Sequence, residues 1–126
     1  MMNDVTTVAL LERLIGFPTV SRDSNLALIE FVRDYLAGLG VDSRLFYNAE
    51  RNKANLFATI GPADRAGVVL SGHTDVVPVD GQDWTVDPFA LTEKDGLLYG
   101  RGTADMKGFI ACVLAAVPSF LARTLS

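Results

Sequence analysis

An apolar run that ends in a polar turn constrains the fold of this chain more than any other feature. Residues 68–70 are Val-Val-Leu, and Ser-Gly-His-Thr-Asp follows at 71–75. An unbroken apolar run of this kind is typical of a strand that is buried on both faces. We therefore predict a strand over Gly67–Ser71 within an α/β fold. Because sites in open α/β sheets lie beyond the carboxyl ends of strands, the turn that follows is the first place to look for chemistry.

Two side chains in this turn are suited to act together. His73 is the only histidine in the sequence, and Asp75 follows it by two residues. In extended backbone, residues i and i+2 point to the same side. A carboxylate beside an imidazole accepts the proton of one ring nitrogen, which fixes the tautomer and leaves the other nitrogen free to bind a metal.

A second carboxylate stands further along, between a glycine-rich turn and a helix-like run. Gly100 and Gly102 indicate backbone that turns tightly or is closely approached, and Asp105 follows them. Near the start of a helix the dipole favours a negative charge, so Asp105 stays ionised and is a good ligand for a divalent metal. His73, Asp75 and Asp105 form the candidate site.

Simpler explanations exist for each part of this site. An isolated His-x-Asp is more often a hydrogen-bonded turn, and a lone aspartate before a helix is more often a cap. Gly100-x-Gly102 suggests a dinucleotide loop, but Asp105 stands at its third glycine position and would repel a pyrophosphate. Lys107 follows methionine rather than the glycine of a phosphate-binding loop. No Gly-x-Ser-x-Gly elbow surrounds Ser71.

Three motifs, in their order and spacing, resemble a known enzyme family. They read GHTDVVP at 72–78, WTVDPF at 84–89 and YGRGTADMKG at 99–108. Together they are similar to the dinuclear-zinc aminoacylase and carboxypeptidase family of metallopeptidases, over nearly the whole chain. Within the family, residues 103–108 and 10–24 most resemble the acetylornithine deacetylases, although the desuccinylases share most of the same residues.

The resemblance implies a role for each residue of the candidate site. His73 would bind one metal ion, Asp105 would bridge two, and Asp75 would be the catalytic-site carboxylate that orients the ring of His73. The ions would be zinc, or cobalt in its place. The peptide bond Asp105–Met106 would be cis. The implied fold is a three-layer αβα mixed-sheet catalytic domain, of which residues 1–126 would be the N-terminal part, with no second domain in this chain.

The activity implied is hydrolysis of the amide bond of a small N-acyl amino acid. N-acetylornithine, in arginine biosynthesis, is the expected substrate, and succinyl-diaminopimelate or a peptide is the alternative. The family also uses a pair of glutamates, a further acidic ligand and a second histidine that this sequence lacks. A non-catalytic truncated fragment without a general base is therefore a further alternative, and we expect the 126 residues alone to be inactive.

The composition limits the classes of partner and the cellular location that we expect for this chain. Eleven Lys and Arg stand against 15 Asp and Glu, and the absence of a basic block argues against nucleic acid. One cysteine, Cys112, excludes an internal disulfide and fits a reducing cytoplasm; we expect it to be buried. The sequence suggests no signal peptide and no stretch long enough to cross a membrane. Sheet edges left open would invite self-association.

Periodicity and turn residues predict the remaining elements. The polar loop Phe17–Ser24 receives no role in the site, except that Ser24 would cap the helix after it. Asn3 or Asp4 would cap the first helix, and Pro118 should end or kink the last. Trp84, Pro88 and Phe89 should pack down the loop that carries them. We expect helices at 4–15, 25–38 and 106–121, the last of them buried nearly all round. We also expect an antiparallel strand pair at 42–47 and 55–60, and a hairpin at 91–94 and 97–99.

Overall fold

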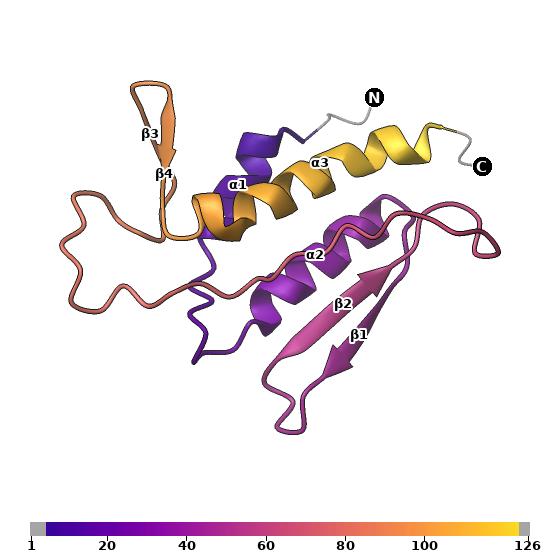
Figure 1. The fold of residues 1–126 in the computed structure, drawn as a ribbon, viewed down its shortest axis with the longest axis horizontal. Coiled ribbons are helices and arrows are strands. Elements are labelled where there is room, and N and C mark those ends of the chain that lie inside the picture. The colour runs from indigo at the N-terminus through magenta and orange to yellow at the C-terminus, as the bar shows by residue number, and fades with distance from the viewer. Residues whose placement is uncertain (1–4, 124–126) are drawn as a thin grey trace.

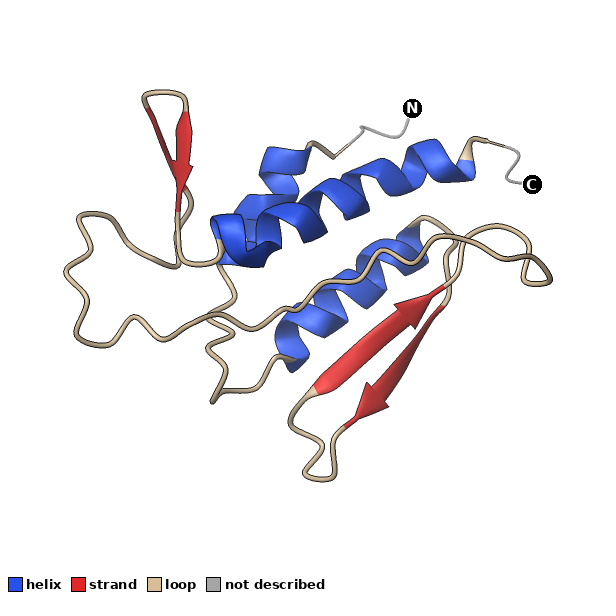
Figure 2. Ribbon diagram, in the orientation of Figure 1, coloured by secondary structure: helices blue, strands red, loops and turns tan. Residues whose placement is uncertain are grey.

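A computed structural model describes residues 5–123 of the chain as helices and short strands (Figures 1 and 2). Helices α1 and α3 lie side by side, and α2 lies across from α3 with the β1–β2 hairpin beyond it. The chain between β2 and the candidate site runs between α3 and β2 as an extended segment. In chain order the elements are α1 (Thr7–Ile15), α2 (Leu26–Gly38), β1 (Ser43–Tyr47), β2 (Ala54–Ala58), β3 (Thr92–Lys94), β4 (Leu97–Tyr99), the helical turn η1 (Thr103–Lys107) and α3 (Gly108–Leu121).

The first two helices form where the periodicity predicts them. The hydroxyl of Thr6 caps α1 by accepting a hydrogen bond from the backbone N–H of Ala9 at 3.1 Å; the caps predicted at Asn3 and Asp4 lie outside the described residues. Ser24 Oγ accepts from the N–H of Leu26 at 3.2 Å, but the residue at the N-cap position of α2 is Asn25, so the cap predicted at Ser24 lies one residue too early. All three helices turn apolar faces into one core: Leu10, Leu11, Leu14, Ile15, Leu28, Ile29, Val32, Leu36, Ala111, Leu114 and Val117.

Both predicted strand pairs are present and antiparallel. In the first, Ser43 lies opposite Ala58. In the second, β3 pairs with β4 across a turn in which Asp95 and Gly96 have φ values of 53° and 74°. Two residues with positive φ give the turn type whose twist matches a two-residue hairpin.

The predicted strand over Gly67–Ser71 is wrong for the part of the chain that the structure describes. The segment is extended, but within residues 5–123 it pairs with no strand. Val68 is 89% exposed and Val69 78%. An apolar run becomes a buried strand only where neighbouring strands take up its backbone groups and cover its side chains. In each hairpin the two strands pair only with each other, so neither hairpin offers this run a neighbouring strand.

The last helix is less buried than its composition predicts. It begins at Gly108 instead of Met106, and Phe109 is 40% exposed. Cys112, expected inside, is exposed. Only the face of α3 that meets α1 and α2 is covered, because in the described chain no element packs on the opposite face. The expectation of a helix buried all round, with a buried cysteine, is therefore corrected.

Pro118 neither ends α3 nor leaves its carbonyl partner without a hydrogen bond. The helix continues to Leu121. Proline has no N–H to donate to the carbonyl four residues earlier, which here belongs to Leu114. The hydroxyl of Tyr35 donates to that carbonyl at 3.0 Å. A side chain of α2 thus replaces the hydrogen bond that Pro118 removes.

By length and composition alone, one helical stretch could cross a membrane. It is Thr103–Leu121, in which η1 runs directly into α3, and 22% of its most apolar window is buried. The expectation that no stretch is long enough fails this test only because Thr103–Lys107 is counted together with α3, although Asp105 and Met106 in it have non-helical φ and ψ. A core helix passes the same test, and this one packs on α1 and carries the buried, charged Lys107.

Candidate metal centre

The loop that sequence reasoning left without a role holds the candidate site in place. Residues 19–21 run parallel to residues 74–76: the N–H of Val76 donates to the carbonyl of Thr19 at 2.9 Å, and the N–H of Ser21 donates to that of Val76 at 3.1 Å. The hydroxyl of Thr19 donates to the carbonyl of Thr74 at 2.6 Å. This short bridge fixes the backbone on which His73 and Asp75 stand.

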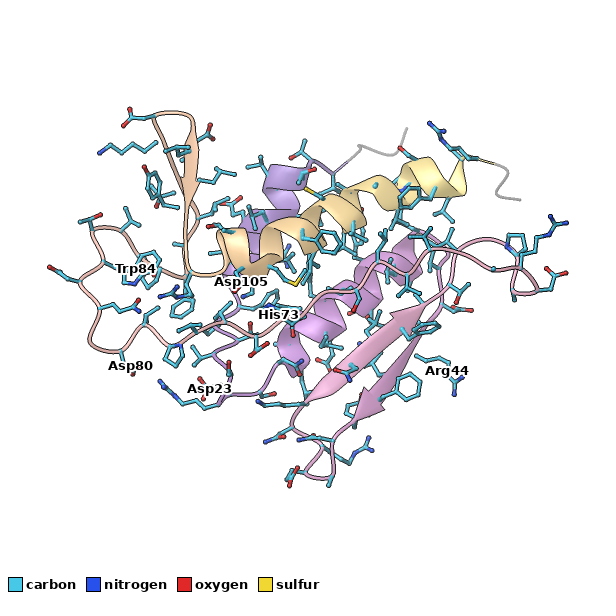
Figure 3. The ribbon with its side chains drawn as sticks, viewed as in Figure 1. Asp23, Arg44, His73, Asp80, Trp84 and Asp105 are labelled. Carbon is cyan, nitrogen blue, oxygen red and sulfur yellow. The ribbon has the colours of Figure 1, made fainter. Side chains whose placement is uncertain are left out.

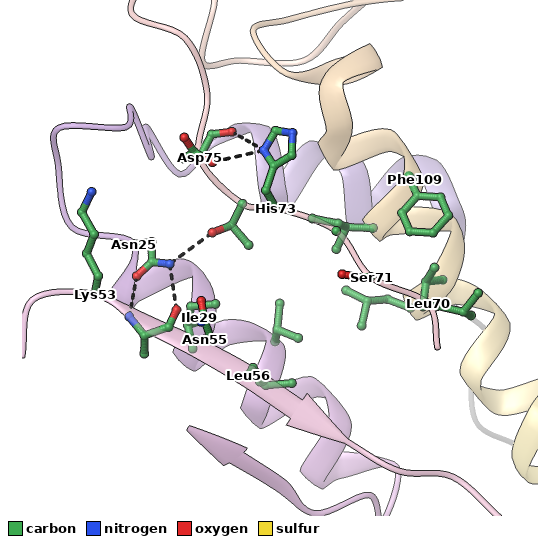
Figure 4. Close-up of a pocket in the computed structure, with 17 residues that line it drawn as sticks. Asn25, Ile29, Lys53, Asn55, Leu56, Leu70, Ser71, His73, Asp75 and Phe109 are labelled. Atoms are coloured by element: carbon green, nitrogen blue, oxygen red, sulfur yellow. Dashed lines mark hydrogen bonds and ion pairs between the residues drawn. The ribbon is translucent and has the colours of Figure 1, made fainter. Parts of the chain in front are cut away.

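The imidazole of His73 lies between the two predicted carboxylates. Its Nδ1 is 3.1 Å from Asp75 Oδ1 and 3.0 Å from the backbone oxygen of Asp75 (Figure 4). Its Nε2 is 2.9 Å from Asp105 Oδ1 (Figure 3). The structure thus brings together all three residues that the sequence singled out. Because the two nitrogens lie on different edges of the ring, the two carboxylates do not face one common point.

These carboxylates set the electrostatics of the ring. The hydrogen bond with Asp105 raises the pKa of His73 above its usual 6.5, the backbone of Asp75 and the charges of both aspartates add to this, and partial burial opposes it. The side chain of His73 is 47% exposed, and that of Asp105 is 82% exposed. The site is therefore an open, negatively charged position that attracts a cation.

Asp75 is held by a residue that sequence reasoning did not place in the site. Ser21 Oγ donates to Asp75 Oδ2 at 2.5 Å, while the other carboxylate oxygen faces the ring of His73. The hydrogen bond from Ser21 is the main cause that lowers the pKa of Asp75. The sequence holds a weak signal for this contact, because Thr19 and Ser21 are spaced by two residues, as His73 and Asp75 are. The local sequence does not indicate, however, that these two extended segments lie side by side.

The turn that carries Asp105 depends on a glycine. Gly102 has a φ of 89°, and a Cβ there would lie 2.6 Å from Val76 Cγ1. The turn therefore passes directly against the backbone stretch that holds Asp75. As the resemblance implied, the peptide bond Asp105–Met106 is cis. Met106 Sδ lies 3.3 Å from the backbone nitrogen of His73 and accepts its hydrogen bond.

Lys107, the second residue that sequence reasoning missed, ties this turn to α1. It is buried, and its ammonium group donates to the carbonyls of Leu14 at 2.9 Å and Phe17 at 2.7 Å. Carbonyls at the end of a helix have no partner within the helix and carry partial negative charge. Burial lowers the pKa of Lys107 to about 8.

The donor set suits zinc but does not complete a site. Imidazole nitrogen and carboxylate oxygen are both zinc ligands. Within residues 5–123, no three side chains of histidine, cysteine, aspartate or glutamate gather where they could hold one ion. Adjacent ligands of a tetrahedral zinc ion lie about 3.4 Å apart, so His73 Nε2 and Asp105 Oδ1, now 2.9 Å apart, would have to separate slightly. The exposure of Asp105 allows this movement.

A groove of about 580 Å³ opens beside His73, between β2, the extended segment and α3 (Figure 4). Its end near the site is polar, and the end towards α3 is apolar. Asn25 closes the polar end: its amide exchanges two hydrogen bonds with the backbone of Ala54, both at 3.0 Å, and donates to the hydroxyl of Thr74 at 3.2 Å. The apolar walls come from Ile29, Val32, Leu56, Leu70, Phe109, Ile110, Val113 and Leu114.

The loop with the second motif lies apart from this centre. Trp84 is half-buried, its indole N–H donates to Gln82 at 2.9 Å, and the guanidinium carbon of Arg101 lies 5.2 Å from the centre of its ring (Figure 3). Pro88 and Phe89 are also half-buried. These contacts agree with the prediction that the three residues pack the loop down, although none of them is fully enclosed.

Comparison with known proteins finds similarity to one family of peptidases. The profile of peptidase family M20/M25/M40 matches residues 69–125. Acetylornithine deacetylases from Pasteurella multocida and Proteus mirabilis are 48% and 45% identical, over 82% and 89% of this chain. Human carnosine dipeptidase 1 superposes with a TM-score of 0.79 and 29% identity over 92% of the chain. These matches make the chain similar to members of peptidase family M20/M25/M40.

The similarity covers a limited part of each relative. The chain spans 29% and 30% of the length of the two bacterial acetylornithine deacetylases, and 28% of the human dipeptidase chain. Within that part it is 45–48% identical to the acetylornithine deacetylases, and the profile match at 69–125 includes all three residues of the candidate site. The predicted α/β metallohydrolase fold class is confirmed by the superposition.

Proposed function

We propose that this chain supplies one side of the metal site of an amide hydrolase that deacetylates N-acetylornithine. The observation that carries the proposal is the pairing of His73 Nε2 with Asp105 Oδ1 at 2.9 Å. This pair lies in a chain that is 45–48% identical to proteins named acetylornithine deacetylase. The wider assignments proposed with it are arginine biosynthesis and a cytoplasmic location.

In this proposal each residue has a defined task. His73 Nε2 and Asp105 hold metal, with zinc as the expected ion and cobalt as a substitute. When bound, such ions polarise the carbonyl of the substrate and acidify water. Asp75 accepts a hydrogen bond from Nδ1–H and so keeps Nε2 unprotonated. The exposed Asp105 carboxylate has a free oxygen, which suits the bridge between two ions that the resemblance implies. No residue of this chain is assigned as the general base.

A chimera tests the proposal. The matching stretch of the Pasteurella multocida acetylornithine deacetylase would be replaced by this chain, and hydrolysis of N-acetylornithine would be measured with zinc present. We expect activity in the chimera and a loss of at least about a thousandfold in its His73→Ala variant, since a lost ligand removes the metal. A folded chimera whose activity is unaffected by His73→Ala would contradict the assignment.

Substrate choice is tested in the same chimera. Cleavage of N-succinyl-diaminopimelate in preference to N-acetylornithine would favour the desuccinylase alternative. A preference for dipeptides would favour a peptidase, as the name of the human relative suggests for that protein. We expect the acetylated substrate to be preferred, because the acetylornithine deacetylases are the relatives at 45–48% identity.

A non-catalytic role for the 126 residues by themselves is the second candidate. It is favoured by the donor set, because no third ligand joins His73 and Asp105 in the described chain. The exposed apolar run at 68–70 and the open groove favour self-association of the isolated chain. Light scattering should then show oligomers, whereas a monomer at all concentrations would count against this candidate. Hydrolysis by the isolated chain would exclude it.

A further inference from the structure

Ser21 stands at the far end of a line of three contacts that leads to the candidate metal position. Its hydroxyl donates to Asp75 Oδ2 at 2.5 Å, Asp75 Oδ1 lies 3.1 Å from His73 Nδ1, and His73 Nε2 lies 2.9 Å from Asp105. The first and last contacts join segments that are more than 30 residues apart. Asp75 uses a different carboxylate oxygen in each of its two contacts, and His73 uses a different ring nitrogen in each of its two. The contacts therefore do not compete.

The backbone around Ser21 leaves its hydroxyl little choice of direction. Its N–H donates to the carbonyl of Val76 at 3.1 Å, and its carbonyl accepts from the ammonium of Lys53. The hydroxyl lies 3.3 Å from the carbonyl of Val76 and 2.5 Å from Asp75 Oδ2, so its strong bond goes to the carboxylate. Hydrogen bonds to an ionised acceptor are short and strong.

Asp75 needs such a partner because solvent reaches it. Its side chain is 51% exposed, and an exposed aspartate can rotate its carboxylate freely. With one oxygen fixed by Ser21, the other stays directed at Nδ1. The ring of His73 then has two acceptors on its Nδ1 edge, the carboxylate and the backbone oxygen of Asp75, against one on its Nε2 edge.

We propose that Ser21 is a positioning residue for the metal site: by fixing the carboxylate of Asp75 it raises the share of the Nδ1–H tautomer of His73, the form whose Nε2 can bind a metal ion, against the competing hydrogen bond from Nε2–H to Asp105. The inference rests on the proposed function for its purpose, but its geometry is independent of any bound ion. The tautomer of a histidine is set by the hydrogen bond that its other nitrogen makes. Substitution of a residue that hydrogen-bonds a metal-binding side chain lowers metal affinity by about 10–100-fold.

The single histidine makes the test direct, because every imidazole signal of this chain comes from His73. The ring nitrogen shifts of the metal-free chain would be measured by nitrogen-15 NMR, about two pH units above the titration midpoint of His73. Because acceptors stand at both ring nitrogens, the wild type should contain a measurable share of the Nδ1–H form beside Nε2–H. In Ser21→Ala the ratio of Nδ1–H to Nε2–H should fall several-fold, and in Ser21→Thr, which keeps the hydroxyl, it should remain near the wild-type value.

Two controls separate positioning from general loosening of the loop. Thr19→Val removes the neighbouring hydroxyl, which bonds the backbone of Thr74 and not Asp75. It should lower the melting temperature and shift the tautomer ratio by less than Ser21→Ala does. In an Asp75→Ala background, Ser21→Ala should have no further effect on the ratio, because the carboxylate through which it acts is gone. Equal shifts in Thr19→Val and Ser21→Ala would overturn the proposal.

Zinc titration of the same variants keeps this inference distinct from the proposed function. If the proposed site binds zinc, Ser21→Ala should weaken binding about tenfold and Ser21→Thr should restore it. A tautomer shift in a chain whose zinc binding does not depend on His73 would support the positioning role and count against the metal site. Zinc binding that depends on His73 but is unchanged in Ser21→Ala, with an unchanged tautomer ratio, would overturn the positioning role alone.

Discussion

The two carboxylates that flank His73 differ in how they are held. Asp75 has a side-chain donor of its own, Ser21, and stands on backbone that is bridged to residues 19–21. Asp105 is 82% exposed, and its carboxylate meets His73 while the turn beneath it is tied down by Lys107. The fold therefore fixes the side chain of one aspartate and the backbone of the other.

This difference matches the tasks proposed for the two residues. A carboxylate that orients a ring must keep one direction, whereas a metal ligand must move enough to admit an ion between itself and its neighbour. Fixing only the backbone leaves the Asp105 carboxylate free to do so. The contrast also predicts which substitutions damage each side.

The largest effect should come from the turn beneath Asp105. In Gly102→Ala the new Cβ would approach Val76 Cγ1 to 2.6 Å at a positive φ. We expect the free energy of unfolding to fall by about 2–4 kcal/mol, measured by urea denaturation. Gly38→Ala is the control: it lies at the exposed end of α2 with nothing within 4 Å of the added carbon, and should be neutral or slightly stabilising. Equal stabilities would contradict the description of the turn.

Removing the anchor of the same turn should have the next effect. Lys107→Met removes the ammonium from the carbonyls of Leu14 and Phe17, which keep only backbone N–H donors. The loss of two hydrogen bonds from a charged donor should cost about 1–3 kcal/mol. Lys94→Met, on an exposed part of β3, should change stability by less than about 0.5 kcal/mol. A Lys107→Met variant as stable as this control would show that the ammonium does not hold the turn.

Lys107 also predicts a pH dependence. Its pKa falls from 10.5 to about 8 in the folded chain, so between these values the unfolded chain binds more protons. The free energy of unfolding should therefore rise as pH increases from 8 towards 10.5, and this rise should be absent in Lys107→Met. A wild-type stability that falls over the same range would contradict the burial of a charged lysine.

Titration of His73 shows which of the two aspartates has the larger effect on the pKa of the ring. Its pKa should lie above 6.5, with Asp105 as the larger cause. Asp105→Asn should thus lower the NMR midpoint more than Asp75→Asn does. Because the folded-state pKa is raised, the stability contributed by the imidazolium is fully present below pH 6.5 and is lost as pH rises through the folded-state pKa. A larger effect of Asp75→Asn would reverse the assignment.

The smallest effect belongs to the outermost contact of the supporting loop. Arg22 forms a two-pronged pair with Asp80 at 2.9 and 3.1 Å, but both side chains are more than half exposed. The guanidinium lowers the pKa of Asp80. Arg22→Ala should leave the free energy of unfolding, measured by urea denaturation, almost unchanged, because exposed ion pairs contribute little. A loss as large as that in Lys107→Met would mean that the loop, and not Ser21 alone, supports Asp75.

Sequence reasoning succeeded where the determining contacts are local. Asp95-Gly96 specified its own turn, and the apolar stripes of α1 and α2 specified their buried faces. It failed for Gly67–Ser71, whose burial depends on neighbours that the described chain does not provide. Composition made α3 look buried all round, but partners cover only one of its faces.

The candidate site shows the same division. His73, Asp75 and Asp105 were recognisable because each stands in a motif with specific spacing. Ser21 and Lys107 were not, because their partners lie 54 and 93 residues away in sequence. An ordinary serine in a polar loop and a lysine beside a helix carry no pattern of their own. Only the fold reveals which carboxylate or carbonyl each one meets.

The central claim is that His73 and Asp105 present a metal-binding pair. Calorimetric titration of the metal-stripped chain with zinc, comparing wild type with His73→Ala, tests it most directly. We expect one bound ion in the wild type and at least a hundredfold weaker binding in the variant, with thermal melts confirming that both are folded. Zinc binding that is absent from both, or equal in both, would contradict it.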